Sequence, residues 1–283
     1  RSKSGKINGA IMTYEQAVAM NPQASKEYKT LGDLYKKDNK IESAINNYKK
    51  YLEKNADSDL AKEVGEYAFK AKKYDEAIKY LSMVSGKDAN DPALLKKFGE
   101  ACYQVKDYQK ANRVFKQLSQ STPSDADVML SLYDIAGKLE SKDEALSYLR
   151  KYTALRPADV EKQRELGDAL YERKDEAGAM AAYGAILKAD PLAKGFFKKY
   201  AELVMKRGKD QEIISVLNAA IAAGEADAQM YVRLGSIYYS QGNFSKAVSM
   251  YDKASQLNPK DGSLLIKLAQ SQAKSGALNA AIL

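Results

Sequence analysis

Large apolar residues followed by a small residue recur along the chain at a nearly constant interval. Around one such pair, Leu234 and Tyr238 lie three and seven positions after Tyr231, which places all three on one stripe of a helix. The pairs are Leu31-Gly32, Val64-Gly65, Phe98-Gly99, Leu132-Tyr133, Leu166-Gly167, Tyr200-Ala201, Leu234-Gly235 and Leu268-Ala269. The first interval is 33 residues and the next six are 34. A fixed period of roughly 20 to 50 residues is typical of repeat architectures.

A second helix follows in each period. A small residue stands twelve positions after the first, at Ala44, Ala77, Ala111, Ala145, Ala179, Ala247 and Ala281, with Ile213 as the bulky exception. An aromatic residue or leucine comes four positions later, at Tyr48, Leu81, Phe115, Leu149, Tyr183, Leu217 and Tyr251. Gly242-Asn243 predicts the turn between two helices, because glycine adopts left-handed backbone angles at little cost. Asp91-Pro92 predicts a helix start, and prolines end many of the second helices, at Pro22, Pro123, Pro157, Pro191 and Pro259.

This pattern resembles the tetratricopeptide repeat along nearly the whole chain. The resemblance implies an all-α fold, a right-handed superhelical α-solenoid of antiparallel helix pairs, in which each pair is stable only when stacked on its neighbours. We expect a single solenoid domain whose parts are a second-helix remnant at 1–24, repeats at 25–57, 58–91, 92–125, 126–159, 160–193, 194–227 and 228–261, and a truncated repeat at 262–283. The pattern is weakest around Ile213 and Gly224, and both ends of the chain are expected to be cuts through a longer array.

Composition narrows the possible functions. The chain has 283 residues, of which 45% are hydrophobic and 29% charged, and no apolar run is long enough to span a membrane. The net charge of +8 is spread as +4, +2, −3 and +5 over residues 1–58, 59–125, 126–193 and 194–283. A diffuse charge with an acidic middle is a poor track for phosphates, so we do not expect nucleic acid as a partner. The compartment stays unknown, because a single cysteine fits both cytoplasmic and periplasmic settings.

Nothing in the sequence predicts an enzyme, a cofactor or a metal site. There is no histidine, and the one cysteine, Cys102, falls on a buried helical stripe, where a small apolar filler is expected. Acidic pairs such as Asp75-Glu76, Asp143-Glu144 and Asp175-Glu176 fall where second helices begin, and helix N-termini favour negative charge.

The candidate site is the set of first-helix residues around the glycine of each repeat. In tetratricopeptide proteins, the resemblance implies, these residues face a concave groove and contact a peptide. The basic and acidic positions are Lys62 and Glu66, Lys96 and Glu100, Arg164 and Asp168, and Lys198 and Glu202; the aromatic positions are Phe69, Tyr103, Tyr171 and Tyr239. Such a ladder suits an extended peptide, although the charges of one helix could instead pair with each other four residues apart.

Toward the C-terminus this wall becomes more apolar and slightly basic. Val232 and Ile266 replace the basic residue, Ser236 and Gln270 replace the acidic one, and Arg233 and Lys267 lie alongside. We expect a hydrophobic peptide anchor to bind here, if one segment of the chain holds it.

Three functions remain open. The leading hypothesis is a non-catalytic scaffold that binds a protein or peptide in the groove. The alternatives are a structural module that self-associates through its repeat ends, and an RNA-binding repeat suggested only by the basic balance. A subgroup of the family grips a C-terminal carboxylate with lysine, asparagine and arginine residues. Lys29, Asp33, Glu63, Ala93 and Lys97 stand at the matching places, and their acidic members would repel that ligand.

Overall fold

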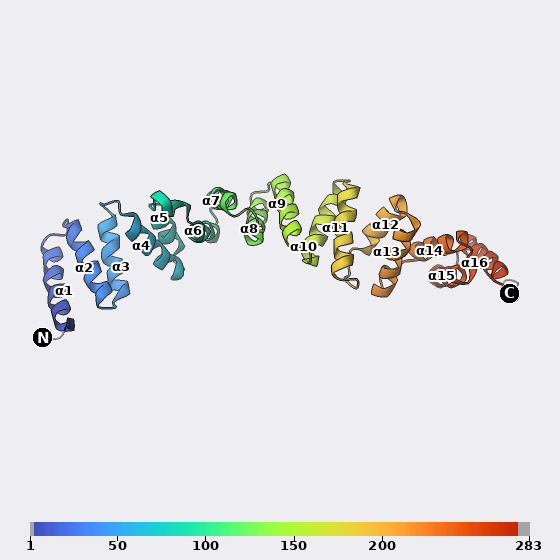
Figure 1. Cartoon of the computed structure of the whole chain (residues 1–283), viewed down its shortest axis with the longest axis horizontal. Helices are drawn as coiled ribbons and strands as arrows, with labels where there is room; N and C mark the ends of the chain where they lie inside the picture. Colours follow the sequence, from blue (N-terminus) through green and yellow to red (C-terminus); the bar gives the residue numbers. More distant parts are fainter. Residues whose placement is uncertain (1–2, 277–283) are drawn as a thin grey trace. The chain divides into compact units, whose positions relative to one another are not determined.

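The computed structural model describes residues 3–276, and all of its regular secondary structure in that range is helical. Its described part contains sixteen α-helices, one short 3₁₀ helix and no strand (Figure 1). The helices are α1 (Lys3–Met20), α2 (Ser25–Lys37), α3 (Ile41–Leu52), α4 (Ser58–Lys70), α5 (Tyr74–Leu81), η1 (Gly86–Asn90), α6 (Pro92–Gln104), α7 (Tyr108–Ser121), α8 (Ala126–Lys138), α9 (Lys142–Leu155), α10 (Val160–Glu172), α11 (Glu176–Ala189), α12 (Phe197–Arg207), α13 (Asp210–Ala223), α14 (Ala228–Ser240), α15 (Phe244–Leu257) and α16 (Gly262–Lys274). None of them has the length and apolar character that a membrane span requires.

The chain divides into two compact units, Arg1–Tyr148 and Leu149–Leu283, each built from paired helices. In the first unit α2 packs against α3, α4 against α5, and α6 against α7. In the second unit the pairs are α10 with α11, α12 with α13, and α14 with α15. The all-α fold of helix pairs is therefore confirmed. The repeat boundaries and the right-handed superhelix stay predictions.

Aspartate side chains start most of the first helices. They accept backbone N–H groups at the N-terminus of the helix, which would otherwise lack a partner. As expected, Asp91 caps α6 through the Ala93 amide at 2.9 Å, and Pro92 is the first helical residue. The same role falls to Asp57, Asp125, Asp159, Asp227 and Asp261.

The turns within the pairs use a left-handed residue at the same place in the period, except in the α12–α13 pair, where Gly208 has φ −74°. Gly242 has φ +74°, as expected for the predicted turn, and the Asn243 side chain caps α15. Five earlier turns place a residue with a side chain in this conformation, namely Asn39, Lys72, Lys106, Glu140 and Lys174. Composition gives no signal for these turns, because the helices on either side impose the conformation despite a cost of about 1–2 kcal/mol per residue.

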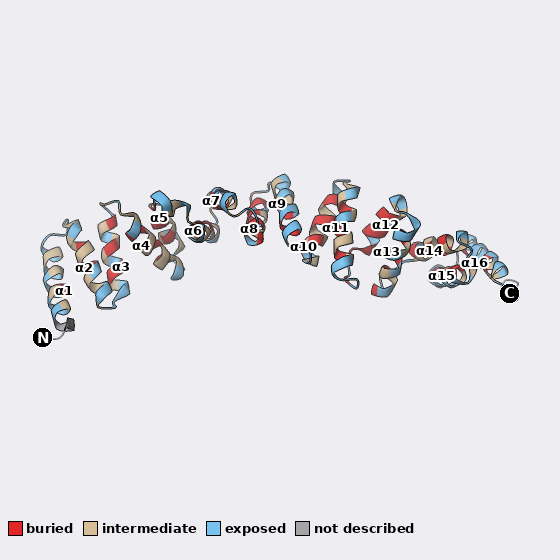
Figure 2. Ribbon diagram, viewed as in Figure 1, coloured by how far each residue is buried: buried red, intermediate tan, exposed pale blue. Residues whose placement is uncertain are grey.

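The glycines that recur once per repeat let the two helices of a pair approach closely. A Cβ atom on Gly235 would lie 2.8 Å from the Tyr251 ring, and one on Gly167 would lie 2.4 Å from the Tyr183 ring. The small residues Ala44, Ala179 and Ala247 on the second helices are fully buried beside these contacts. The buried residues follow the facing sides of the helices, while the outer sides are exposed (Figure 2).

The pair α12–α13 departs from the pattern. Ala193 stands where six of the other first helices have a capping aspartate, and α12 begins only at Phe197, without a side-chain cap. Phe196 and Phe197 are instead buried, with ring centroids 4.3 Å apart, and Phe196 stacks on Tyr183 of α11 at 6.0 Å. Aromatic packing thus replaces the first turn of the helix. Gly224, with φ +75°, ends α13 in this irregular pair.

Candidate functional site

The predicted residues lie on successive first helices, and we call this surface the first-helix face. It consists of the side chains two and three positions before the small residue of each first helix, and one and four positions after it. Helices α2, α4, α6 and α8 carry it in the first unit, and α10, α12, α14 and α16 carry it in the second. Each unit is described by itself.

In the first unit, hydrogen bonds and ion pairs join one first helix to the next. Lys97 Nζ of α6 lies 2.5 Å from Glu66 Oε1 of α4. The Tyr103 hydroxyl of α6 donates to the carboxylate of Asp134 on α8, and this bond raises the pKa of Tyr103 to about 12. The predicted residues Glu66 and Tyr103 are therefore placed on this face, but each already has a partner within the protein.

Two lysines that stand three positions before the glycine, Lys29 and Lys62, reach the capping residues of the next pair. Lys62 Nζ lies 3.3 Å from Asp88 and 3.6 Å from Asp91, and the hydrogen bond to Asp88 raises its pKa. Lys29 likewise pairs with Asp57 at 2.6 Å, and that hydrogen bond lowers the pKa of Asp57. These lysines therefore connect one pair of helices to the next.

The second unit repeats this arrangement on α10 and α12. Asp168 accepts hydrogen bonds from Lys199 Nζ at 2.8 Å and from the Tyr183 hydroxyl at 2.7 Å. The Tyr171 hydroxyl donates to Glu202 at 2.7 Å, which raises the pKa of Tyr171, and Lys199 Nζ lies 5.6 Å from the centre of the Tyr171 ring. Two carboxylates thus receive the lysine and tyrosine donors of this face.

Pairing between residues four positions apart on one helix, the alternative that the sequence left open, does not form at these positions. Over the described residues, no salt bridge joins the basic and acidic residue four positions apart at Lys62–Glu66, Lys96–Glu100, Arg164–Asp168 or Lys198–Glu202. Arg164 pairs with Glu161 at 2.6 Å instead. Among the described residues Lys96, Glu100 and Lys198 have no ion-pair partner, so these three predicted charges stay available.

The aromatic residues of the face also close the hairpin turns. The rings of Phe69 and Tyr74 lie edge to face with centroids 5.9 Å apart, and the rings of Tyr103 and Tyr108 pack in the same way at 5.4 Å. Tyr239 packs against Phe244 at 5.2 Å. In each case the partner is the first residue of the second helix. Removing such a ring would therefore disturb the turn as well as any ligand contact.

The C-terminal part of the face has fewer internal partners. The Ser236 hydroxyl donates to the Val232 carbonyl at 3.0 Å and lies 3.1 Å from the Tyr251 hydroxyl. Ile266 is 61% exposed, and the exposed side chains of Lys267 and Gln270 have no hydrogen-bond partner among the described residues. Arg233 lies 3.9 Å from Asp210, and its buried Nε atom has no hydrogen-bond partner.

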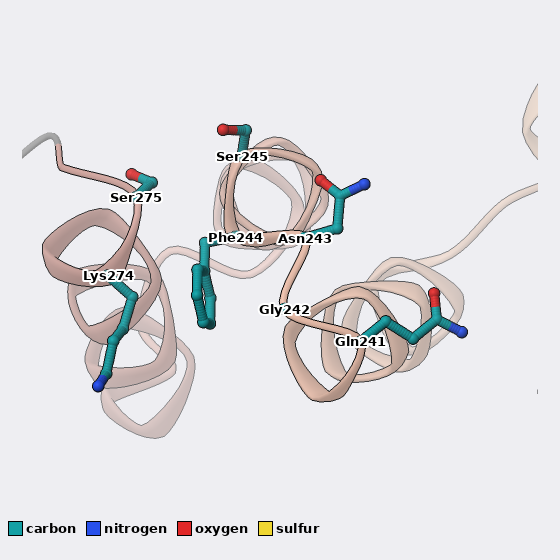
Figure 3. A pocket seen from close by; sticks show the side chains of 7 residues that line it. All are labelled: Gln241, Gly242, Asn243, Phe244, Ser245, Lys274 and Ser275. Atoms are coloured by element: carbon teal, nitrogen blue, oxygen red, sulfur yellow. The ribbon is translucent and has the colours of Figure 1, made fainter.

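Surface pockets recur at the hairpin turns. One of about 440 Å³ is lined by Gln241, Gly242, Asn243, Phe244, Ser245, Lys274 and Ser275, and Figure 3 shows the Phe244 ring between the Gly242 turn and the end of α16. A second, of about 330 Å³, is lined by Lys72, Lys73, Tyr74, Asp75, Glu76 and Val105, at the equivalent place in the period. Because both pockets lie at the same place in the period, we attribute them to the way in which the helix pairs stack. A third pocket, of about 620 Å³, lies between α1 and α2.

The acidic pairs connect the second helix of one pair to the second helix of the next. Glu76 accepts Lys49 at 2.5 Å, Glu144 accepts Lys116 at 2.9 Å, and Asp175 accepts Arg150 at 2.7 Å. Asp175 also caps α11 through the Gly178 amide, and this bond together with Arg150 lowers its pKa. Each carboxylate thus has a structural role at the start of a second helix.

Other groups of possible chemical interest are also structural. Cys102 is fully buried, as expected for a core filler, and burial raises the pKa of its thiol to about 11. No group of three His, Cys, Asp or Glu side chains in the described part of the chain is placed to hold a metal ion.

Sequence reasoning missed the lysines two positions before the small residue of α6 and α12. Lys97 and Lys199 are the cations that bind Glu66 and Asp168, yet they were not among the predicted contacts. Asp134 was missed as well, because Tyr133 stands where the glycine marks the other repeats. Their positions in the repeat could have revealed them, because each stands at a fixed number of residues from the residue at the glycine position of its repeat.

Comparison with known proteins agrees with this architecture. Three tetratricopeptide repeat family models match, one at residues 228–261, one at 68–132 and one at 29–92 and 130–194. Superkiller complex protein 3 of Mus musculus is 27% identical over 143 residues, which are 50% of this chain and 9% of that protein. TPR repeat-containing protein MJ1428 of Methanocaldococcus jannaschii is 29% identical over 192 residues, covering 52% of this chain and 34% of that protein.

Among solved structures, one of MamA superposes with a TM-score of 0.43 at 19% identity, covering 60% of this chain and 92% of MamA. A structure of YrrB, a TPR protein with an unusual peptide-binding site, gives a TM-score of 0.33 at 18% identity, covering 89% and 94%. The family models together cover residues 29–194 and 228–261, which is more than half of the chain. This protein therefore belongs to the tetratricopeptide repeat family.

Proposed function

We propose that the chain is a protein-interaction scaffold that holds an extended segment of a partner protein along its first-helix faces. Tetratricopeptide repeats are generally non-catalytic and bind proteins, which supports the broader part of this proposal. The observation that carries the finer part is the contact between successive first helices. Lys97 with Glu66 joins α4 to α6, and Lys199 with Asp168 joins α10 to α12, which supports a shared surface on these neighbouring helices.

The dimensions of this surface suit an extended chain. Packed helices lie about 8–10 Å apart, and an extended peptide rises about 3.3 Å per residue, so each first helix meets about three peptide residues. Regularly spaced side chains of the peptide would then meet equivalent positions on successive helices. Main-chain and side-chain contacts add up along such a track, as in other modes of peptide recognition.

The unpaired charges are the best candidates for selecting the ligand. Lys62, Glu66 and Asp168 already satisfy partners in the protein, so a ligand would have to displace those contacts. Lys96 and Glu100 of α6 stand on the same face without such partners. We expect a ligand of the first unit to meet these two side chains first.

Selection from a random peptide library on the purified chain, followed by fluorescence anisotropy with a selected peptide, tests the proposal. Lys96→Glu should weaken binding of peptides that map to the first unit by about tenfold, because it reverses an available charge on the face. The matched control is Arg113→Glu, which makes the same charge change on the exposed side of the second helix α7. Equal effects of the two substitutions would contradict the proposal.

Hydrogen exchange of the complex provides an independent readout. Protection should concentrate in α4, α6 and α8, or in α10, α12, α14 and α16, with little change in the second helices. Protection confined to second helices would place the ligand elsewhere. End-to-end self-association stays a separate prediction, and sedimentation velocity over a concentration series measures it.

A further inference from the structure

The first-helix face of α14 and α16 keeps the hydrogen-bond donors of the face but lacks its carboxylates. On α10 and α12, a lysine and a tyrosine each meet a carboxylate of the protein. Lys199 donates to Asp168 at 2.8 Å, and Tyr171 donates to Glu202 at 2.7 Å. These four residues show what a completed part of the face contains.

The same two donors recur two periods later. Lys267 stands 68 positions after Lys199, and Tyr239 stands 68 positions after Tyr171. Where Asp168 and Glu202 stand on α10 and α12, the chain has Ser236 and Gln270. Neither side chain carries a charge, so the Lys267 amine and the Tyr239 hydroxyl have no carboxylate opposite them.

The remaining cation of this region is also incompletely matched. Arg233 occupies on α14 the position that Lys199 occupies on α12. By analogy with Lys199 and Asp168, the partner of Arg233 would be Glu202 of α12. Glu202 instead accepts the hydrogen bond of the Tyr171 hydroxyl, and the Arg233 guanidinium lies 3.9 Å from Asp210. The buried Arg233 Nε atom has no hydrogen-bond partner. The Arg233 side chain as a whole is 41% exposed, so a carboxylate from outside the chain can reach it and pair with its charge.

No acidic residue of α14 or α16 is available to compensate. Neither helix contains an aspartate or glutamate. Asp227 and Asp261 cap the two helices. The Ser263 hydroxyl, the backbone amides that Asp261 accepts and, as the weakest cause, the charge of Lys267 lower the pKa of Asp261. The exposed Ile266 and the half-buried Val232 lie on the same face. The local surface is therefore cationic with apolar side chains beside the charges.

We propose that the face of α14 and α16 binds an acidic segment of a partner protein. Side-chain carboxylates of that segment take the places that Asp168 and Glu202 hold on α10 and α12, and they receive Lys267, Arg233 and the Tyr239 hydroxyl. An apolar residue of the segment contacts Val232 and Ile266. This inference rests on the proposed scaffold function and specifies both the part of the chain and the chemistry of the ligand.

The test uses the whole chain and a fluorescein-labelled peptide of about 12 residues in which glutamate alternates with leucine, long enough at about 3.3 Å per residue to cross both helices. Two comparison probes are the same peptide with lysine for every glutamate and a single-stranded RNA of similar length. The acidic peptide should bind at least about tenfold more tightly than the lysine peptide, because only its charges complement this face.

The decisive variant is the double substitution Ser236→Asp and Gln270→Glu. It builds carboxylates where α10 and α12 have them, so it should leave the unfolding temperature unchanged or raise it, while affinity for the acidic peptide falls about tenfold. Ser215→Asp with Ser249→Asp is the matched control, since it adds the same charge on exposed positions of α13 and α15. That control should bind like the unmodified chain.

Unchanged affinity in the decisive variant, or equal loss in the control, would overturn the inference. So would tighter binding of the RNA, which would assign the cations to phosphate. If the acidic peptide fails to bind but a library peptide binds and responds to Lys96→Glu, only the inference fails. If no peptide binds the chain at all, the proposed function fails with it.

Discussion

The close approach of α10 and α11 makes a strong prediction about Gly167. A Cβ atom at this position would lie 2.4, 2.7 and 3.0 Å from three carbon atoms of the Tyr183 ring. Ordinary contacts between carbon atoms are about 3.5–4.0 Å, so the ring would have to move by about 1 Å. Tyr183 has little room to move, because it is fully buried, stacks on Phe196 and donates to Asp168 at 2.7 Å.

The expected magnitude follows from three contributions. Alanine favours the helix over glycine by about 0.8–1.0 kcal/mol. Overpacking a rigid core costs about 1–3 kcal/mol, and weakening a hydrogen bond to a carboxylate costs about 1 kcal/mol more. Gly167→Ala should therefore destabilise the chain by about 2 kcal/mol. Gly137 is the matched control, because it lies in α8 with no atom within 4 Å of an added Cβ. Gly137→Ala should stabilise by up to about 1 kcal/mol.

The chain itself contains a pair that tolerates alanine at this place. Ala201 and Leu217 occupy, one period later, the positions of Gly167 and Tyr183. Tyr183→Leu should therefore remove most of the penalty of Gly167→Ala, and a double-mutant cycle should give a coupling energy of about 2 kcal/mol. Urea unfolding followed by circular dichroism gives the free energies, and hydrogen exchange of α10 and α11 shows where the loss occurs. Stabilisation by Gly167→Ala, or additive effects in the cycle, would refute the close-packing explanation.

The remaining predictions concern turns, the thiol and acid stability. Gly242→Ala should lower the free energy of unfolding by about 1 kcal/mol, whereas Lys174→Gly should leave it unchanged or raise it slightly, because both positions are left-handed; urea unfolding measures both. Cys102 should react with a thiol reagent at pH 8 only as fast as the protein opens, because its pKa is about 11 and it is buried; fast labelling of the folded chain would contradict this. Asp175 and Glu176 have lowered pKa values in the folded state, so their stabilisation is complete above about pH 5 and is lost as the pH falls through and below about 4. The unfolding temperature should fall over that range, and less steeply in Asp175→Asn.

The helical pairs and most of the core could be predicted from spacing alone. Residues such as Gly167 and Tyr183 recur at fixed positions, and a regular period leaves few ways to bury them. The irregular start of α12 was only partly visible. Its sequence lacks the capping aspartate at residue 193, but stacking of Phe196 on Tyr183 depends on side chains that are not neighbours in the sequence.

The candidate face divides in the same way. The sequence placed Glu66, Asp168 and Tyr171 on first helices at ligand-facing positions, and whether they contact a ligand stays a prediction. Their partners Lys97, Lys199 and Glu202 lie 31 residues away along the chain, and each contact requires two helices to stack at the right offset.

The sequence by itself determined that this protein is an array of helix pairs, because a repeated spacing of large and small residues admits one way of packing them. Only the tertiary structure decided which charges of the face are already paired and which, as at Lys96 and Lys267, are left for a partner. The physical reason is that an ion pair depends on the few ångströms between side chains of different repeats, and spacing within one repeat does not specify that distance.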